Sequence, residues 1–276
     1  MSTLLQRHNV RVFGNGQIPM IFAHGYGCDQ NMWRYITPAF EDKYRIVLFD
    51  HVGHGQADAS TFDKVKYGTL QGYVDDVLAI CRELDLTGAV FVGHSVSAMI
   101  GVLAANREPE WFARLVLIGP SPCYINEGDY IGGFAKADIE ALLDTLDSNH
   151  LGWSSAMGPV IMGNPDRPEL GEELTNSFCR THPDIAKHFA RVTFLSDNRN
   201  DLRQARIKSL VLQCSADVIA PESVGYYVHQ NLRDSKLVVM QATGHCPNLS
   251  APDETILAMQ AFLAELEHPA AVQRHF

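Results

Sequence analysis

Short continuous runs of apolar residues recur along the chain, and segments with helical spacing separate them. Such runs show no alternation of polar and apolar side chains, so they are typical of strands buried on both faces of a parallel sheet. They predict strands at residues 19–25, 45–50, 89–95, 114–120, 209–217 and 236–245. Amphipathic spacing predicts helices at 69–86 and 252–266. Alternating strands and helices with short connections predict an open α/β sheet.

The region from about Ser121 to Asn200 breaks this alternation because it contains no strand-like run. Its apolar residues follow helical spacing in segments 137–149, 152–162, 169–179 and 184–195. A block of helices between two sheet strands predicts a lid at the carboxyl ends of the strands, where such sheets bind ligands. We therefore expect a first part of the core (1–120), a helical lid (121–200) and a second part of the core (201–276).

Composition limits the classes of protein that fit. The 276 residues, 46% of them hydrophobic, suffice for one large domain. The net charge of −10 and the absence of a basic cluster disfavour nucleic acid and anionic membranes as partners. Arg7, His8 and Arg11 stand where a signal peptide needs apolar residues, and no run is long enough for a membrane helix. Six scattered cysteines are typical of reduced thiols, so we expect a soluble cytoplasmic protein.

A serine stands where the strand predicted at 89–95 turns into a helix, in the sequence VFVGHSVSAMIG. The pattern matches the G-x-S-x-G elbow, with Ser97 in place of the second glycine. Serine becomes a nucleophile when a base removes its proton and fixed dipoles stabilise the oxyanion. An elbow exposes Ser95 and directs the backbone N–H of Val96 at that charge. Ser97 is small enough to keep the turn tight. The alternative is that Ser95 only caps an ordinary helix.

An acid and a histidine follow the elbow, each after a late predicted strand. Asp217 lies in SADVIAP and His245 in ATGHCPNLSAP. Because the carboxyl ends of parallel strands share one edge of a sheet, we expect both side chains to meet Ser95. His245 would act as general base and then general acid, while Asp217 orients it. Alternatively, Asp217 caps a helix near Pro221 and His245 is a structural turn residue. The order serine, acid, histidine favours a catalytic triad.

In the sequence AHGYGCDQNMW, residues His24 to Gly27 follow the apolar strand residues Met20–Ala23. A glycine-rich loop at this place donates the second oxyanion hydrogen bond in enzymes with such an elbow. We assign that donor to the backbone N–H of Tyr26 and expect its ring to form part of the pocket floor. The alternative for these glycines is a plain turn.

Other features of the sequence are interpreted as scaffold. His51 and His54 are spaced as metal ligands can be, but no third ligand lies nearby, so we expect no metal. FGNGQIPM lacks the third glycine and the following helix of a dinucleotide fingerprint, and no cofactor is expected. Cys246 beside His245 is a rival nucleophile, but it lacks an elbow and is interpreted as a packing residue.

Together these motifs resemble the α/β-hydrolase superfamily. More closely, they resemble the subgroup that holds the bacterial stress-signalling protein RsbQ and the karrikin and strigolactone receptors of plants. Only the ending EHPAAVQRHF falls outside the shared pattern, and Ser97 agrees with the plant-type elbow. The stretches that carry the resemblance are HGYGCDQNMW, GHSVSAMIG, LVLIGPSPCYINEGDYIGGF, FLSDNRNDL, SLVLQCSADVIAP and GHCPNLSAPDE.

The resemblance implies a V-shaped lid of four helices over an apolar cavity with a narrow mouth. By matching motif, the residues implied to line it are Tyr26, His94, Tyr124, Phe134, Phe194, Ile219 and His245. Met157 and Phe178 lie in lid segments that match too loosely to carry a role over. The subgroup also implies a slow hydrolase of a small apolar ester or butenolide-like lactone that doubles as a sensor. Its implied partner is a PAS-domain phosphatase that activates a general-stress sigma factor.

Two other hypotheses about the function fit the same residues. In one, the protein is a ligand receptor or interaction protein with a vestigial triad. In the other, it is a metabolic esterase or a hydrolase of carbon–carbon bonds that shares the triad and differs in its lid. Dehalogenases and epoxide hydrolases are excluded because they need a carboxylate nucleophile at the position of Ser95.

Overall fold

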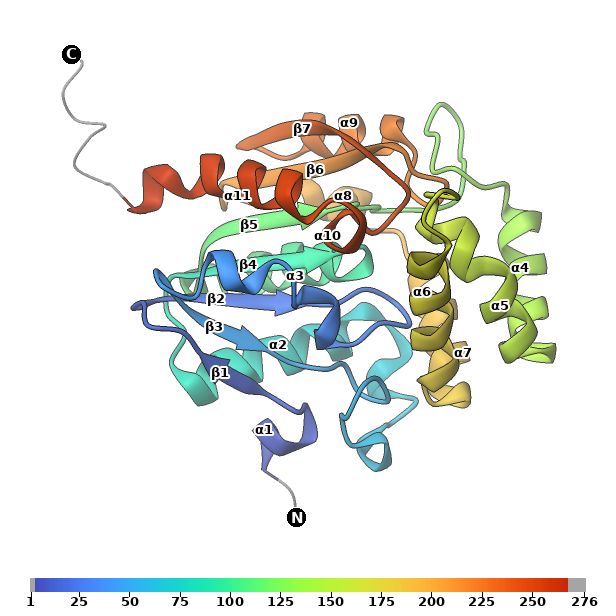
Figure 1. The fold of residues 1–276 in the computed structure, drawn as a ribbon, viewed down its shortest axis with the longest axis horizontal. Helices are drawn as coiled ribbons and strands as arrows, with labels where there is room; N and C mark the ends of the chain where they lie inside the picture. The colour runs from blue at the N-terminus through green and yellow to red at the C-terminus, as the bar shows by residue number, and fades with distance from the viewer. Residues whose placement is uncertain (1–2, 268–276) are drawn as a thin grey trace.

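The computed structural model describes residues 3–267, so the ending at 268–276 lies outside the described residues. In the described part, one seven-stranded sheet has the order β1-β3-β2-β4-β5-β6-β7 (Figure 1). Only β1 runs antiparallel, beside β3, and the other neighbouring strands are parallel. The strands are β1 (Arg11–Phe13), β2 (Ile18–Ala23), β3 (Tyr44–Leu48), β4 (Ala89–His94), β5 (Phe112–Ile118), β6 (Ser209–Ala216) and β7 (Ser235–Thr243).

Successive residues of each central strand enter separate hydrophobic clusters on the two faces of the sheet. In β4, Val90 and Val92 face one cluster and Phe91 faces the other. Burial on both faces explains why the strands are continuous apolar runs. The covering helices are α10 (Pro247–Ser250) and α11 (Pro252–Glu267) on the first face, and α2 (Leu70–Leu84), α3 (Val96–Arg107) and α9 (Glu222–Asn231) on the second.

The edge strand β1 is the one strand of the described sheet that the sequence pattern does not predict. It has only three residues, and Val12 is 42% exposed, so no apolar run marks it. Further short elements connect the larger ones. They are α1 (Leu4–Arg7), α8 (Arg199–Leu202) and the 3₁₀ turns Gln30–Trp33, Thr37–Ala39, Ala59–Thr61, Lys66–Gly68 and Pro109–Trp111.

Four consecutive helices lie in sequence between β5 and β6. They are α4 (Lys136–Ser148), α5 (His150–Met162), α6 (Pro168–Arg180) and α7 (Pro183–Phe194). Figure 1 shows them gathered beyond the carboxyl ends of the strands. Helix α7 rests on the core through Phe189, whose ring stacks on Tyr73 of α2 with centroids 4.3 Å apart. We propose the division into core (1–120), lid (121–200) and core (201–276) on this arrangement.

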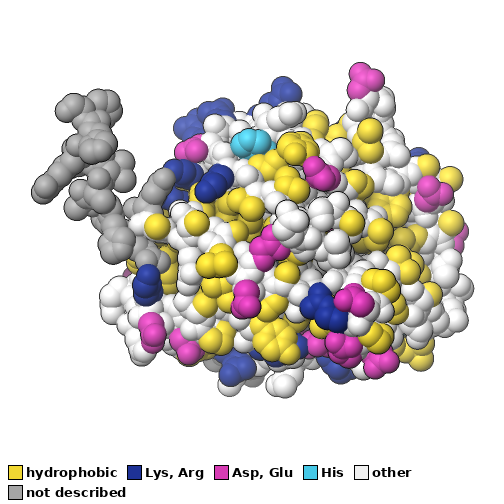
Figure 2. Space-filling view, turned by 45° about the horizontal axis from the view of Figure 1, so that its top comes forward, with side chains coloured by type: hydrophobic (Ala, Val, Ile, Leu, Met, Phe, Trp, Pro, Cys, Tyr) yellow, Lys and Arg dark blue, Asp and Glu magenta, His cyan; other side chains and the backbone are white. Residues whose placement is uncertain are grey.

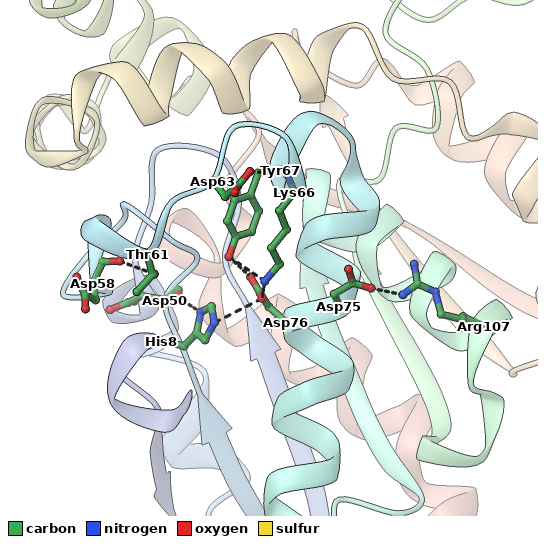
Figure 3. A network of polar contacts seen from close by, with 10 residues as sticks. All are labelled: His8, Asp50, Asp58, Thr61, Asp63, Lys66, Tyr67, Asp75, Asp76 and Arg107. Carbon is green, nitrogen blue, oxygen red and sulfur yellow. Dashed lines mark hydrogen bonds and ion pairs between the residues drawn. The ribbon is translucent and has the colours of Figure 1, made fainter. Parts of the chain in front are cut away.

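A buried acidic group ties the N-terminal segment to α2 (Figure 3). The Asp76 carboxylate, 4% exposed, accepts hydrogen bonds from Lys66 Nζ and from the Tyr67 hydroxyl at 2.9 Å. His8 Nε2 lies 3.6 Å from the same carboxylate, and His8 Nδ1 contacts the Asp50 carbonyl at 3.3 Å. Every oxygen of this carboxylate therefore has a partner.

The molecular surface mixes charge types. On the face drawn in Figure 2, lysine and arginine side chains stand singly or in small groups beside acidic and hydrophobic ones. Among the described residues, none of the helices combines the length and the apolar character that a bilayer span requires.

Candidate active site

Ser95 occupies a strained turn between β4 and α3. Its backbone has φ 57° and ψ −124°, a region that residues with a side chain seldom adopt. Because the turn is tight, a Cβ on Gly93 would lie 2.4 Å from the Ser97 carbonyl oxygen, and only glycine fits there. The Ser95 N–H donates to the Ile118 carbonyl at 2.8 Å and fixes the turn to β5. This geometry is that of the predicted elbow, which aims Ser95 out of the sheet.

The structure brings Ser95, Asp217 and His245 into direct contact. Ser95 Oγ lies 2.8 Å from His245 Nε2, and His245 Nδ1 lies 2.6 Å from Asp217 Oδ2. Because a carboxylate only accepts, Nδ1 carries the proton, and Nε2 is the acceptor for the serine hydroxyl. The other oxygen of Asp217 accepts from the N–H groups of Ile219 and Ala220 at 2.8 and 3.0 Å. A serine is therefore hydrogen-bonded to an oriented base.

Backbone contacts from the lid hold the histidine. The His245 N–H donates to the Ile161 carbonyl, near the end of α5, at 2.9 Å. Gly244 has φ +77°, and a Cβ there would lie 1.8 Å from the Met162 carbonyl oxygen. The sequence places a glycine where the lid and the histidine loop touch through their backbones.

The two backbone N–H groups predicted to hold the oxyanion belong to Tyr26 and Val96. Val96 is the first residue of α3, so its N–H has no partner within the helix. The Tyr26 N–H makes no hydrogen bond within the described residues. The loop before it comes close to the serine, because a Cβ on Gly25 would lie 3.2 Å from Ser95 Cβ and 2.6 Å from His94 Nδ1. The oxyanion role of these two amides stays a prediction.

A cavity of about 30 Å³ lies over Ser95, between the core and the lid. Of the residues that the resemblance implied, Tyr26, His94, Tyr124, Phe194, Ile219 and His245 line it. Phe178, left without a role, lines it too. The lining residues that sequence reasoning missed are Cys28, Ile161, Leu174, Thr193 and Cys246. Ile161, Leu174 and Thr193 sit on amphipathic lid helices, where sequence spacing does not separate core-facing from cavity-facing positions.

Phe134 is an exception, because the structure does not place it in the cavity wall. It is half-buried in the loop before α4, where its N–H donates to the Tyr124 carbonyl at 3.1 Å and its carbonyl accepts from the Asn126 N–H at 2.8 Å. This backbone pairing holds Phe134 against the hydrophobic cluster beside the cavity. Met157 lines a separate groove between α4 and α5.

Burial keeps His94 and Cys246, two groups of the cavity wall, uncharged. It lowers the pKa of His94 to about 3, and the neutral ring donates through Nε2 to the His245 carbonyl at 2.7 Å. Burial raises the pKa of the Cys246 thiol, so the rival nucleophile is held as a protonated thiol. Within residues 3–267, the buried hydroxyls of Tyr124 and Thr193 have no hydrogen-bond partner, and Tyr124 lies beside Ser95. The cavity is apolar with two unpaired hydroxyls.

The histidines at 51 and 54 lie together with His24, the nearest ring centroids being 4.6 Å apart. Within residues 3–267, no group of three or more histidine, cysteine or acidic side chains has an arrangement that could hold a metal ion. His51 instead donates its backbone N–H to His24 Nε2 at 3.0 Å.

Comparisons with known proteins identify the family and the relatives of this chain. Residues 20–258 match the family described as the Alpha/beta hydrolase family. The chain is 36% identical over 273 residues to the Karrikin insensitive 2 receptor CA of Petunia hybrida, covering 99% of this chain and 100% of that protein. It is 40% identical over 250 residues to the Strigolactone esterase D14 of Arabidopsis thaliana, covering 90% and 93%.

A solved structure, that of a hydrolase from Oleispira antarctica, superposes with a TM-score of 0.92. It is 37% identical to this chain, and the match covers 95% of this chain and 96% of the other. Sequence, fold and family match thus agree over nearly the whole chain. The protein belongs to the alpha/beta hydrolase family.

Proposed function

We propose that this protein is a serine hydrolase that cleaves a small apolar ester or lactone-like compound through an acyl-enzyme on Ser95. One observation carries the proposal. Ser95 Oγ, on a strained elbow, lies 2.8 Å from a histidine nitrogen whose ring is oriented by Asp217 at 2.6 Å. A hydroxyl, a base and an orienting carboxylate in series are what acyl transfer by serine needs.

In the first half of the reaction, His245 Nε2 takes the Ser95 proton while the serine oxygen bonds to the substrate carbonyl carbon. The carbonyl oxygen becomes negative and accepts hydrogen bonds from the N–H groups of Tyr26 and Val96. When this intermediate collapses, the bond to the alkoxy leaving group breaks, and His245 gives that oxygen its proton. The acyl group stays on Ser95. In a lactone the leaving alcohol remains attached to it.

In the second half, a water molecule replaces the alcohol. His245 removes a proton from the water as its oxygen attacks the acyl carbon, and the same two amides hold the oxyanion. Collapse returns the proton to Ser95 Oγ and releases the carboxylic acid. Asp217 stays ionised throughout and stabilises the imidazolium in each half.

The cavity supports a small substrate. About 30 Å³ has room for only a few atoms beyond the reacting carbonyl, and most of the lining side chains are apolar. The unpaired hydroxyls of Tyr124 and Thr193 are available to a hydrogen-bond acceptor on such a compound. A bulkier compound requires the lid to move away from the core.

The tight cavity and the receptors among the relatives favour a second candidate function. In it the protein is mainly a ligand receptor, and turnover is slow or incidental. We propose that it then acts in stress signalling with a PAS-domain phosphatase, as the RsbQ-like motifs imply. Purified PAS-domain phosphatases of the host are the test. Binding of one of them supports this role, and failure of all of them to bind removes it.

The hydrolase proposal is tested with p-nitrophenyl acetate. We expect turnover by the wild type and a loss on the order of 10⁴-fold in Ser95→Ala, because the nucleophile is gone. Ser209→Ala is the matched control. Its hydroxyl is also fully buried, and it donates to the Ile207 carbonyl at the amino end of β6, away from the site. Equal turnover by wild type and Ser95→Ala would contradict the proposal.

A further inference from the structure

A second serine, Ser97, lies fully buried two residues after the nucleophile and bridges two other segments. Its hydroxyl donates to the His24 carbonyl oxygen, 2.5 Å away, and its oxygen lies 2.8 Å from His51 Nε2. Because a carbonyl oxygen only accepts, the serine proton is directed to His24. His51 Nε2 must therefore carry the proton that the serine oxygen accepts.

The same histidines close a ring of hydrogen bonds. The His51 N–H donates to His24 Nε2 at 3.0 Å, and His24 Nδ1–H donates to the Gly25 carbonyl at 2.8 Å. Burial lowers the pKa of both histidines, so both are neutral and act through hydrogen bonds. His24 is thus held through its carbonyl by Ser97 and through its ring by His51.

This ring joins the two segments that carry the proposed oxyanion amides. Ser97 directly follows Val96, and His24 stands two residues before Tyr26. The hydrogen bond from Ser97 to His24 therefore fixes the first turn of α3 relative to the loop after β2. Glycine at this place in the usual elbow pattern has no side chain with which to make such a bond.

We propose that Ser97 is a positioning residue that sets the spacing of the Tyr26 and Val96 N–H groups. Its hydroxyl acts through the His24 carbonyl and is itself oriented by His51. Displacing an oxyanion donor by a fraction of an ångström weakens its bond to the transition state more than its contact with the substrate. The inference rests on the proposed hydrolase function, because it assigns work to the oxyanion amides.

The lid covers this hydrogen-bonded ring on its outer side. The aromatic ring of Phe189, on α7, has its centroid 5.8 Å from that of the His51 imidazole and 6.0 Å from that of the Tyr26 ring. Water is thereby kept from competing for the serine hydroxyl, and the bonds of the ring gain strength in the apolar surroundings.

Ser97→Ala tests the proposal, because it removes the hydroxyl and leaves room in the turn. We expect kcat for p-nitrophenyl acetate to fall by about 10- to 100-fold while KM changes less than about threefold. Affinity for a small alkyl boronic acid, which forms a tetrahedral adduct on the nucleophile, should fall by the same factor as kcat/KM. Ser209→Ala, which also removes a buried hydroxyl, should lower the melting temperature and leave kcat within about twofold.

Three outcomes are distinguished. If the wild type is active and Ser97→Ala keeps its kcat, or loses no more than Ser209→Ala does, the positioning role is wrong and the hydrolase proposal stands. If the wild type neither hydrolyses esters nor binds the boronic acid, both are wrong. If Ser97→Ala does not fold, Ser97→Cys replaces it. The weaker donor should still lower kcat and boronic acid affinity together, and unchanged values would overturn the role.

Discussion

Among the described residues, two buried histidine–aspartate pairs lie in different parts of the molecule, and one of them lies beside a serine and a cavity. His245 Nδ1 is 2.6 Å from Asp217 at the carboxyl ends of the strands, whereas His8 Nε2 is 3.6 Å from Asp76, part-way along α2 (Figure 3). Both carboxylates are almost inaccessible to solvent. A histidine beside an aspartate therefore does not define a catalytic site by itself.

The surroundings of the pairs differ. Lys66 and Tyr67 satisfy Asp76, so its network is closed on itself. The other pair faces a serine in a strained backbone conformation and a cavity with unpaired hydroxyls. Unpaired polar groups and strain cost stability, and they persist where a ligand or a transition state uses them. The His8–Asp76 pair therefore contributes to stability, whereas the His245–Asp217 pair has the surroundings that the proposed reaction needs.

The largest expected effect comes from the same substitution in both pairs. Asp217→Asn should lower kcat by about 10²- to 10⁴-fold, because the amide no longer holds the histidine in its basic tautomer. Asp76→Asn should leave kcat unchanged and lower the free energy of unfolding by about 2 kcal/mol, since Lys66 and Tyr67 lose a charged acceptor. Steady-state kinetics and thermal unfolding of both variants make the measurement. If Asp76→Asn lowered kcat as much as Asp217→Asn does, the proposed difference between the two pairs would be wrong.

A smaller effect, a loss of folding stability at acidic pH, is expected from buried histidines in both regions. Burial lowers the pKa of His8 even beside Asp76, and it lowers the pKa of His54 and His94 to about 3. The unfolded chain takes up protons at these sites below its ordinary pKa near 6.5, and the folded chain does not. Stability is therefore present above that value and is lost as the pH falls, by roughly 2 kcal/mol at pH 5 for each histidine with a pKa about 3.

Urea unfolding at pH 7 and pH 5 measures this loss. His54→Phe is the control, because it removes one titrating ring and keeps an aromatic group beside Phe189. We expect the variant to lose less stability than the wild type between the two pH values. Equal losses would show that His54 is not held neutral in the folded protein.

The smallest effect concerns a single hydroxyl in the cavity. Thr193→Val removes a buried hydroxyl without a partner, so it should raise the free energy of unfolding by about 1 kcal/mol. Thr255→Val removes an equally buried hydroxyl that donates to the Ala251 carbonyl at 3.0 Å, so it should lower stability by a similar amount. Thermal unfolding of the two variants decides. Destabilisation by both would mean that Thr193 is paired in solution.

The sequence predicts the sheet well because its central strands are buried on both faces. The runs at 89–95 and 209–217 need no knowledge of their neighbours to be read as strands. The edge strand β1 is not predicted because two of its three residues are exposed and the third is half-buried. The four lid helices follow from spacing alone, within one or two residues at most of their ends.

The order of the candidate site residues and most of the implied cavity lining could be predicted, whereas the contacts around them could not. A serine elbow after one strand, and an acid and a histidine that each follow a later strand, single out Ser95, Asp217 and His245 by their position along the chain. The partners of Ser97 depend on three segments that meet only in the folded molecule. The place of Phe134 depends on backbone pairing within one loop. Contacts of these kinds, through side chains or through the backbone of a loop, leave no periodic pattern in the sequence.

The most direct test of the central claim is covalent labelling of the nucleophile. When an activated serine attacks the phosphorus of a p-nitrophenyl alkylphosphonate, p-nitrophenolate leaves and the alkylphosphonyl group stays on the serine as a stable tetrahedral adduct. Peptide mass spectrometry should find one such group per chain, on Ser95. Ser95→Ala should carry no label, and Asp217→Asn should be labelled at a reduced rate. An unlabelled wild type, or a label on Cys246 in place of Ser95, would contradict the account.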